Sequence, residues 1–142
     1  MTATDGPAIA AVCEDDLGDL LPLMRAYCDF YEVAPSDDEL LSLSRALIAD
    51  PEHEGVQLLA RDEGRAVGFA TIFWSWATTS AERIGVMNDL FVAILRCASA
   101  GSYSLRSAMR RAALRCAEHR SGHRSAPWRG QSADQNGAGC GW

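Results

Sequence analysis

The sequence contains no lysine, because all 13 of its basic residues are arginine. This absence indicates a GC-rich coding sequence rather than any particular chemistry. The chain also lacks an apolar stretch of the roughly 20 residues that a membrane-spanning helix needs. Its first residues lack the basic patch and apolar run of a signal peptide. We therefore expect a cytoplasmic protein with no membrane partner.

The cysteines lack the spacing of a metal site or a disulfide framework. There are five, an odd number, with no Cys-x-x-Cys pair and no cysteine–histidine cluster of zinc-site spacing. His119 and His123 are four residues apart, but no acidic or third ligand accompanies them. The sequence therefore predicts reduced thiols and no metal.

Val, Ile, Phe and Tyr nearly disappear after Ala93, and the charge changes sign at the same point. Residues 1–93 carry 17 acids against 5 arginines, whereas residues 94–142 carry 8 arginines against 2 acids. Ala, Arg, Ser and Gly make up 30 of these last 49 residues. We expect a folded domain over residues 1–93, followed by a poorly ordered segment 94–142 with at most one helix.

Two amphipathic helices are predicted after a short apolar strand at residues 8–12. Apolar residues recur at helical spacing over residues 17–31. Pro22 requires this helix either to begin near Asp19 or to kink. The second helix spans about residues 36–50, and its first four residues, Ser-Asp-Asp-Glu, match the capping box.

Three strands are predicted next, at residues 56–61, 67–76 and 84–92. The first two are joined by a polar link that contains Gly64, which is a hairpin signal. The β-α-α-β-β-β order with short links indicates an α/β fold, in which helices flank a mixed, mainly antiparallel sheet. In the last strand, alternation assigns one face to Ile84, Val86, Leu90 and Val92, and the other to Met87, Asp89 and Phe91.

This order of elements and three short phrases resemble the GNAT superfamily of N-acetyltransferases over about residues 8–93. The phrases are Leu20-Leu21-Pro22-Leu23-Met24, residues 62–70 at the hairpin, and Asn88-Asp89-Leu90-Phe91-Val92-Ala93, which is similar to the family's fourth strand. The resemblance implies transfer of an acetyl group from acetyl-CoA to an amine, carried by a small molecule or a polypeptide.

The resemblance also implies which residues form the site. In that family the fourth strand leaves its outer backbone groups free for the pantetheine arm of acetyl-CoA, which binds as an added strand does. Leu90, Phe91 and Val92 would supply these main-chain contacts. Asp89 is the candidate general base toward the amine. The alternative for Asp89 is a structural role, with hydrogen bonds at a strand bulge.

Four aromatic residues are candidates for binding the acceptor amine. Trp74 and Trp76 lie on one face of their strand, where rings beside acids attract a cation. Tyr27 and Tyr31 lie on the first helix and would border the acceptor site. The alternative for all four is core packing, which for the two tryptophans would be against the first two helices.

The glycine-rich turn that holds the pyrophosphate in this family is missing after Ala93. Residues 94–103 contain only one glycine, Gly101. We therefore expect weak or absent acetyl-CoA binding. Two alternatives to a working enzyme follow: a non-catalytic module that binds an anionic partner, or a non-functional truncated acetyltransferase. Nucleic acid is not expected, because the arginines of residues 106–129 lack aromatic interleaving or a known motif.

The composition after Ala93 is typical of a shifted GC-rich reading frame. We hypothesise that residues from about Ile94 onward are read out of frame, the alternative being a genuinely divergent C-terminal half. Translation of the other two frames of the DNA is expected to give the glycine-rich turn. The hypothesis fails if neither frame encodes it.

Overall fold

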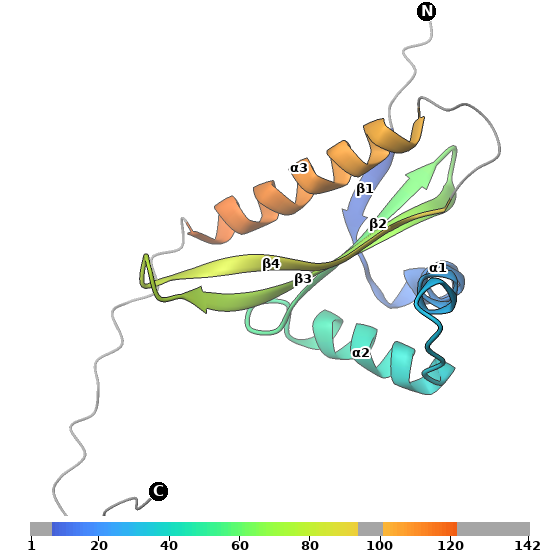
Figure 1. The fold of residues 1–142 in the computed structure, drawn as a ribbon, viewed down its shortest axis with the longest axis horizontal. Coiled ribbons are helices and arrows are strands. Elements are labelled where there is room, and N and C mark those ends of the chain that lie inside the picture. The colour runs from blue at the N-terminus through green and yellow to red at the C-terminus, as the bar shows by residue number, and fades with distance from the viewer. Residues whose placement is uncertain (1–6, 94–100, 122–142) are drawn as a thin grey trace, which may run out of the picture.

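The computed structural model describes residues 7–93 and 101–121, with the side chains of its last helix described over residues 105–115. The strands are β1 (Ala8–Ala11), β2 (Gly55–Asp62), β3 (Arg65–Ala77) and β4 (Glu82–Val92), and the helices are α1 (Leu17–Phe30), α2 (Asp37–Ala49) and α3 (Gly101–Ser121). The strands form one sheet in the order β1-β2-β3-β4, and every pairing is antiparallel. The helices α1 and α2 cover one face and α3 covers the other (Figure 1). The predicted α/β class and order of elements are confirmed.

A local signal placed the start of α2, whereas the start of α1 was left open. The capping box of α2 is present, because Ser36 Oγ accepts the Glu39 N–H at 3.3 Å and the Glu39 carboxylate accepts the Ser36 N–H at 2.7 Å. These bonds give partners to N–H groups that a helix start leaves unpaired. The helix α1 begins at Leu17 and contains Pro22 in its interior. The alternative of a start near Asp19 is therefore wrong.

The predicted hairpin between β2 and β3 is confirmed, with a turn of two residues. Asp62 pairs with Arg65, and the turn residues Glu63 and Gly64 have φ angles of 48° and 79°. Two consecutive positive φ values are those of a type I′ turn, whose twist matches that of the flanking strands. Glycine adopts such a φ without the steric cost that a Cβ brings.

One extra residue in β4 shifts the pairing of this strand with β3. Thr71 lies opposite Asp89, whereas the next residue of β3, Ile72, lies opposite Met87. Asn88 is therefore left without a partner and forms a β-bulge. After a bulge of one residue, each following side chain of the strand lies on the face opposite to the one that simple alternation predicts.

The bulge makes the predicted alternation in the last strand wrong. Met87 packs on the α3 side of the sheet together with Leu90 and Val92. Alternation in the sequence had instead placed Ile84 and Val86 on the same face as Leu90 and Val92, and Met87 on the other. Ile84 and Val86 are exposed, and they lie on the face that carries α1 and α2.

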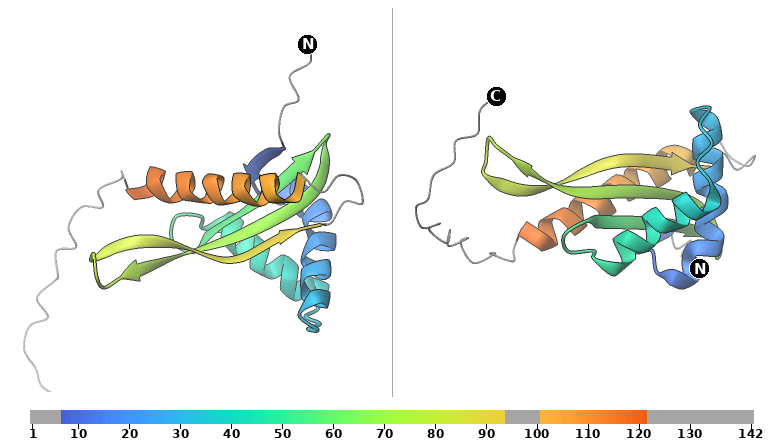
Figure 2. Two further views of the ribbon diagram at one scale, coloured as in Figure 1. Left: turned by 45° about the horizontal axis from the view of Figure 1, so that its top comes forward. Right: turned by 90° about the horizontal axis from the view of Figure 1, so that it is seen from below.

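The core consists of two apolar layers, one on each side of the sheet. Figure 2 shows the helices that lie on the two sides. On one side α3 packs through Leu105, Met109 and Ala113, all of which are buried. Arg106, Arg110, Arg111 and Arg115 lie on its exposed surface. This helix is the one element that the sequence allowed within residues 94–142.

The packing of α3 leads to a prediction about stability. Met109→Ala removes a fully buried side chain and should lower the free energy of unfolding by about 2–5 kcal/mol. Arg110→Ala, on the exposed surface of the same helix, should change it by less than about 0.5 kcal/mol. Urea denaturation measures both. Equal, small effects would contradict the packing of α3 on the sheet.

Candidate functional site

The outer edge of β4 has no neighbouring strand among the residues that the structure describes. The Ala93 N–H donates to the Val67 carbonyl at 2.9 Å. Hydrogen-bonded and non-hydrogen-bonded pairs alternate along an antiparallel ladder. Phe91 therefore directs its peptide groups toward β3, whereas Leu90 and Val92 direct theirs to the open edge. Of the three residues predicted to bind the cofactor, two thus carry outward backbone groups.

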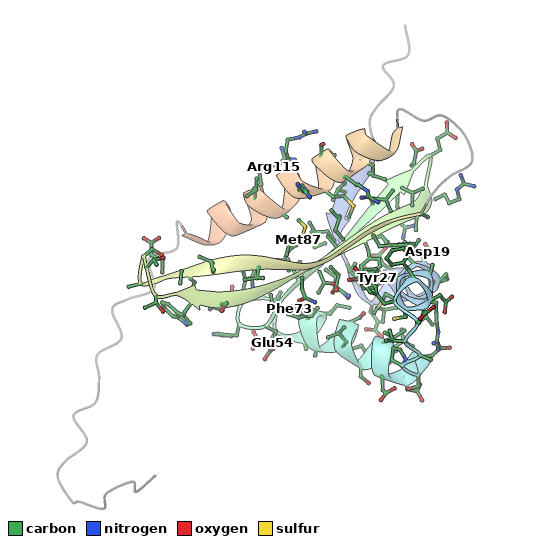
Figure 3. The ribbon with its side chains drawn as sticks, viewed as in Figure 1. Asp19, Tyr27, Glu54, Phe73, Met87 and Arg115 are labelled. Atoms are coloured by element: carbon green, nitrogen blue, oxygen red, sulfur yellow. The ribbon has the colours of Figure 1, made fainter. Side chains whose placement is uncertain are left out.

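Asp89 lies beside this edge, on the face of the sheet that α1 covers. Tyr27 Oη donates to Asp89 Oδ1 at 2.9 Å, and Asn88 Nδ2 donates to the same oxygen at 3.1 Å. Tyr27 lies between α1 and the sheet (Figure 3). Within the described part of the chain, no hydrogen bond falls on Asp89 Oδ2. One carboxylate oxygen is therefore held in place, and the other is available.

These contacts contain both features of the structural alternative for Asp89, namely a bulge and hydrogen bonds beside it. The available Oδ2 is what a general base also needs. A catalytic role for Asp89 therefore stays a prediction. Sequence reasoning missed that Asn88 is the bulge residue. Its signal was an asparagine, a residue depleted in strands, within an otherwise β-forming run.

Aromatic rings surround Tyr27 and partly bury it. The ring centroids of Tyr31, Phe69 and Phe91 lie 5.0, 5.7 and 6.1 Å from that of Tyr27, all in edge-to-face geometry. Burial, and then the hydrogen bond to Asp89, raise the pKa of Tyr27 well above its ordinary value. The phenol therefore stays protonated at neutral pH and keeps donating to the carboxylate.

The end of α1 exposes the ring of Tyr31 and one further ring, Phe30, next to this cluster. Phe30 and Tyr31 are 76% and 58% exposed, and their ring centroids lie 5.1 Å apart. Tyr31 also contacts Tyr27, which binds Asp89. The structure therefore brings Tyr27, Tyr31 and Asp89 into one continuous group at the open edge.

The two tryptophans lie on the opposite face of the sheet. Trp74 packs beside the apolar cluster under α3, and its Nε1 donates to the Pro51 carbonyl at 2.8 Å. Trp76 is 68% exposed. Core packing of these rings against the first two helices is therefore wrong. The sheet separates both tryptophans from Tyr27 and Asp89.

Two features are absent from the part of the chain that the structure describes. No helix within residues 7–93 and 101–121 is long and apolar enough to cross a membrane. No three metal-binding side chains gather among residues 7–93 and 105–115, whose side chains are described. The predicted lack of a glycine-rich turn concerns residues 94–100, which lie outside the described residues. The side chains of His119 and His123, which were not expected to bind metal, lie outside them too.

Comparison with known proteins places this architecture among acetyltransferases. Two solved structures have the same fold. One is a ribosomal-protein-alanine N-acetyltransferase of Brucella melitensis, with 20% identity, a TM-score of 0.61, and coverage of 82% of this chain and 75% of that chain. The other is a predicted acetyltransferase of Clostridium acetobutylicum solved with acetyl-CoA, with 14% identity, a TM-score of 0.62, and coverage of 80% and 75%. The chain thus has an acetyltransferase fold.

One curated relative is similar in sequence. The uncharacterized N-acetyltransferase YhfO of Bacillus subtilis is 31% identical over 77 residues, which are 54% of this chain. The match spans only half the length of that relative. No family model matches the chain. The resemblance to GNAT N-acetyltransferases that the sequence predicted is confirmed by these findings.

The raised pKa of Tyr27 leads to a prediction about pH. An unfolded tyrosine releases its proton near pH 10, whereas Tyr27 in the folded protein retains it to higher pH. The stabilisation due to Tyr27 is therefore complete below pH 10 and declines as the pH rises above it. Tyr27→Phe should lower the free energy of unfolding by about 1 kcal/mol at pH 8, and by less above pH 10.

Tyr31→Phe is the comparison variant, because Tyr31 raises the pKa of Tyr27 less than burial and the hydrogen bond to Asp89 do. Its loss of stability should therefore be smaller and should change less with pH. Denaturation of both variants at pH 8 and pH 10.5 gives the comparison. A loss for Tyr27→Phe that does not change with pH would contradict the role assigned to its buried phenol.

Proposed function

We propose that this chain is a GNAT-type N-acetyltransferase, which transfers an acetyl group from acetyl-CoA to a primary amine in the cytoplasm. The observation that carries the proposal is the position of the Tyr27–Asp89 pair directly beside the open edge of β4. The acetyltransferase fold and the sequence similarity to YhfO support it.

The edge of β4 suits an extended, amide-containing arm. Leu90 and Val92 offer their N–H and C=O groups outward, and these alternate as donor and acceptor in the way that an added strand requires. Acetyl-CoA has such an arm in its pantetheine, and it supplies an acetyl group activated as a thioester. Outward N–H groups at this edge can also bind the carbonyl oxygen as negative charge develops on it.

Asp89 is suited to receive the proton of the amine. Its Oδ1 is held by Tyr27 and Asn88, so that Oδ2 is presented in a defined position. In the proposed reaction Oδ2 accepts a proton from the amine, directly or through water, as the nitrogen bonds to the carbonyl carbon. The carbon–sulfur bond breaks, and the CoA sulfur leaves with the electron pair and takes up a proton. Tyr27 acts as a positioning residue, because it donates to the carboxylate throughout.

The surroundings of the site favour a cationic acceptor. The exposed rings of Phe30 and Tyr31 can bind an ammonium group through their faces. The 17 acids against 5 arginines in residues 1–93 attract cations to this part of the molecule. The acceptor is either a small molecule or a polypeptide amine, and the latter agrees with the name of the Brucella protein.

Binding of acetyl-CoA is expected to be weak. In the family that the chain resembles, main-chain N–H groups of a glycine-rich turn at a helix start hold the pyrophosphate. The sequence that follows β4 has one glycine in residues 94–103 and does not match that turn. The edge of β4 then has to provide most of the affinity, so a high KM for acetyl-CoA belongs to the proposal.

A second function is favoured by the surface of α3. Arg106, Arg110, Arg111 and Arg115 are all exposed, and no acidic residue lies between them. Such a surface suits an anionic partner, and the chain would then be a binding module with an acetyltransferase fold. A correctly folded protein without any turnover would favour this function over catalysis.

Asp89→Asn tests the proposed mechanism, because it keeps the shape of the side chain but removes the base. Acetylation of a panel of primary amines at millimolar acetyl-CoA should fall by about 10²–10⁴-fold in kcat/KM. The control Asp62→Asn, at the exposed end of β2, should leave kcat/KM within about twofold. Equal activity of Asp89→Asn and wild type would rule out Asp89 as the base, and saturation at low micromolar acetyl-CoA would rule out weak binding.

A further inference from the structure

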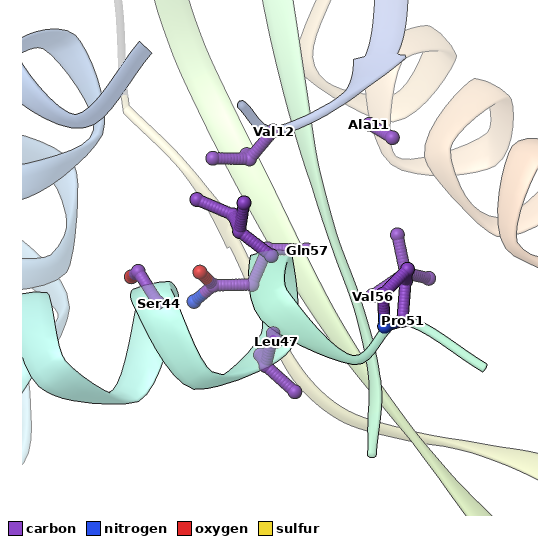
Figure 4. A pocket seen from close by; sticks show the side chains of 8 residues that line it. Ala11, Val12, Ser44, Leu47, Pro51, Val56 and Gln57 are labelled. Atoms are coloured by element: carbon purple, nitrogen blue, oxygen red, sulfur yellow. The ribbon is translucent and has the colours of Figure 1, made fainter. Parts of the chain in front are cut away.

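A small pocket lies between α2 and the sheet, beside β1 and β2 (Figure 4). It is on the same face of the sheet as Asp89, but near the opposite edge. Its volume is about 130 Å³. Its walls are mainly apolar and include Val12, Leu47, Ile48 and Pro51. The open edge of β4 does not contribute to it, so the pocket is separate from the site described above.

Gln57 brings an unpaired polar atom to this apolar pocket. The residue is 3% exposed, and its Nε2 donates to Thr71 Oγ1 at 3.3 Å. Its Oε1 is buried and has no hydrogen-bond partner among the described residues. A buried acceptor without a donor lowers the stability of the fold. A donor that enters the pocket would recover this stability.

A second oxygen lines the pocket across from Gln57. Ser44 is fully buried on α2, and its Oγ donates to the Leu40 carbonyl at 3.3 Å. A hydroxyl whose proton is engaged in this way still has lone pairs to accept a hydrogen bond. The amide of Gln57 is directed toward Ser44 (Figure 4). Both polar groups therefore call for a donor on the ligand rather than an acceptor.

We propose that this pocket binds a small molecule with a compact apolar body and a single N–H or O–H donor, which bonds to Gln57 Oε1. A cavity of about 150 Å³ holds benzene, whereas one water occupies only about 30 Å³. The pocket, at about 130 Å³, thus matches about five or six non-hydrogen atoms. A single water would pair with Gln57 but leave most of the apolar wall without contacts.

The position of Gln57 connects the pocket with Asp89. In the sheet Gln57 pairs with Thr71, and Thr71 pairs with Asp89. Side chains of directly opposite residues share a face and lie close together. A ligand bound to Gln57 is therefore at one end of a row of polar side chains that crosses β2, β3 and β4 and ends at Asp89.

Pyrrole and furan form a matched pair of probes, because both are five-membered rings but only pyrrole has an N–H donor. Titrations followed by ¹H–¹⁵N NMR should show that wild type binds pyrrole about tenfold more tightly than furan, with shifts at Gln57 and Ser44. Gln57→Leu should abolish or reverse this preference, because it replaces the acceptor by an apolar group of similar size. Gln57→Met is the second variant if Gln57→Leu does not fold.

Three outcomes would overturn the proposal: no binding of either probe to wild type, equal binding of both, or a preference for pyrrole that survives the loss of the Gln57 amide. The first outcome corresponds to a pocket that holds water only. The readout is binding and does not require turnover, so its result is independent of the acetylation assay.

Discussion

The extra residue Asn88 in β4 is the constraint on which the candidate site depends. Up to Met87, β4 pairs with β3 in one register, and from Asp89 onward its pairing is shifted by one residue. Without this extra residue, Asp89 would point to the α3 side of the sheet, into an apolar cluster where a carboxylate without partners is costly. With it, Asp89 turns toward Tyr27, which donates the hydrogen bond that a partly buried carboxylate needs.

The two faces of the sheet have different roles as a result. The face under α3 is lined by apolar side chains such as Leu58, Ala70 and Ile72, and it serves as the scaffold. The face under α1 and α2 is also mainly apolar, but it contains the buried polar residues Gln57 and Thr71 in line with Asp89. Most polar groups inside a core find hydrogen-bond partners, and among the described side chains Gln57 Oε1 is the exception. Both the candidate site around Asp89 and the small pocket lie on this second face.

Much of the backbone was predictable because its signals are local. The capping box of α2 and the Glu63-Gly64 turn each depend on a few adjacent residues whose own chemistry specifies the geometry. The faces of β4 were not predictable from alternation, because a bulge depends on the pairing with β3. The burial of Met109 was missed for a similar reason, since the arginine-rich composition of its segment hid a narrow apolar stripe of α3.

The sequence by itself determined the order of the elements up to β4, the start of α2 and the hairpin, and it indicated the acetyltransferase resemblance through residues 88–93. Only the tertiary structure decided that Asp89 meets Tyr27, that Trp74 packs on the opposite face, and that Gln57, with its unpaired buried oxygen, lines a pocket. The physical reason is range. Helix caps and two-residue turns are formed by neighbours along the chain, whereas a contact between residues 27 and 89 exists only after the sheet has registered its strands and a helix has packed on it.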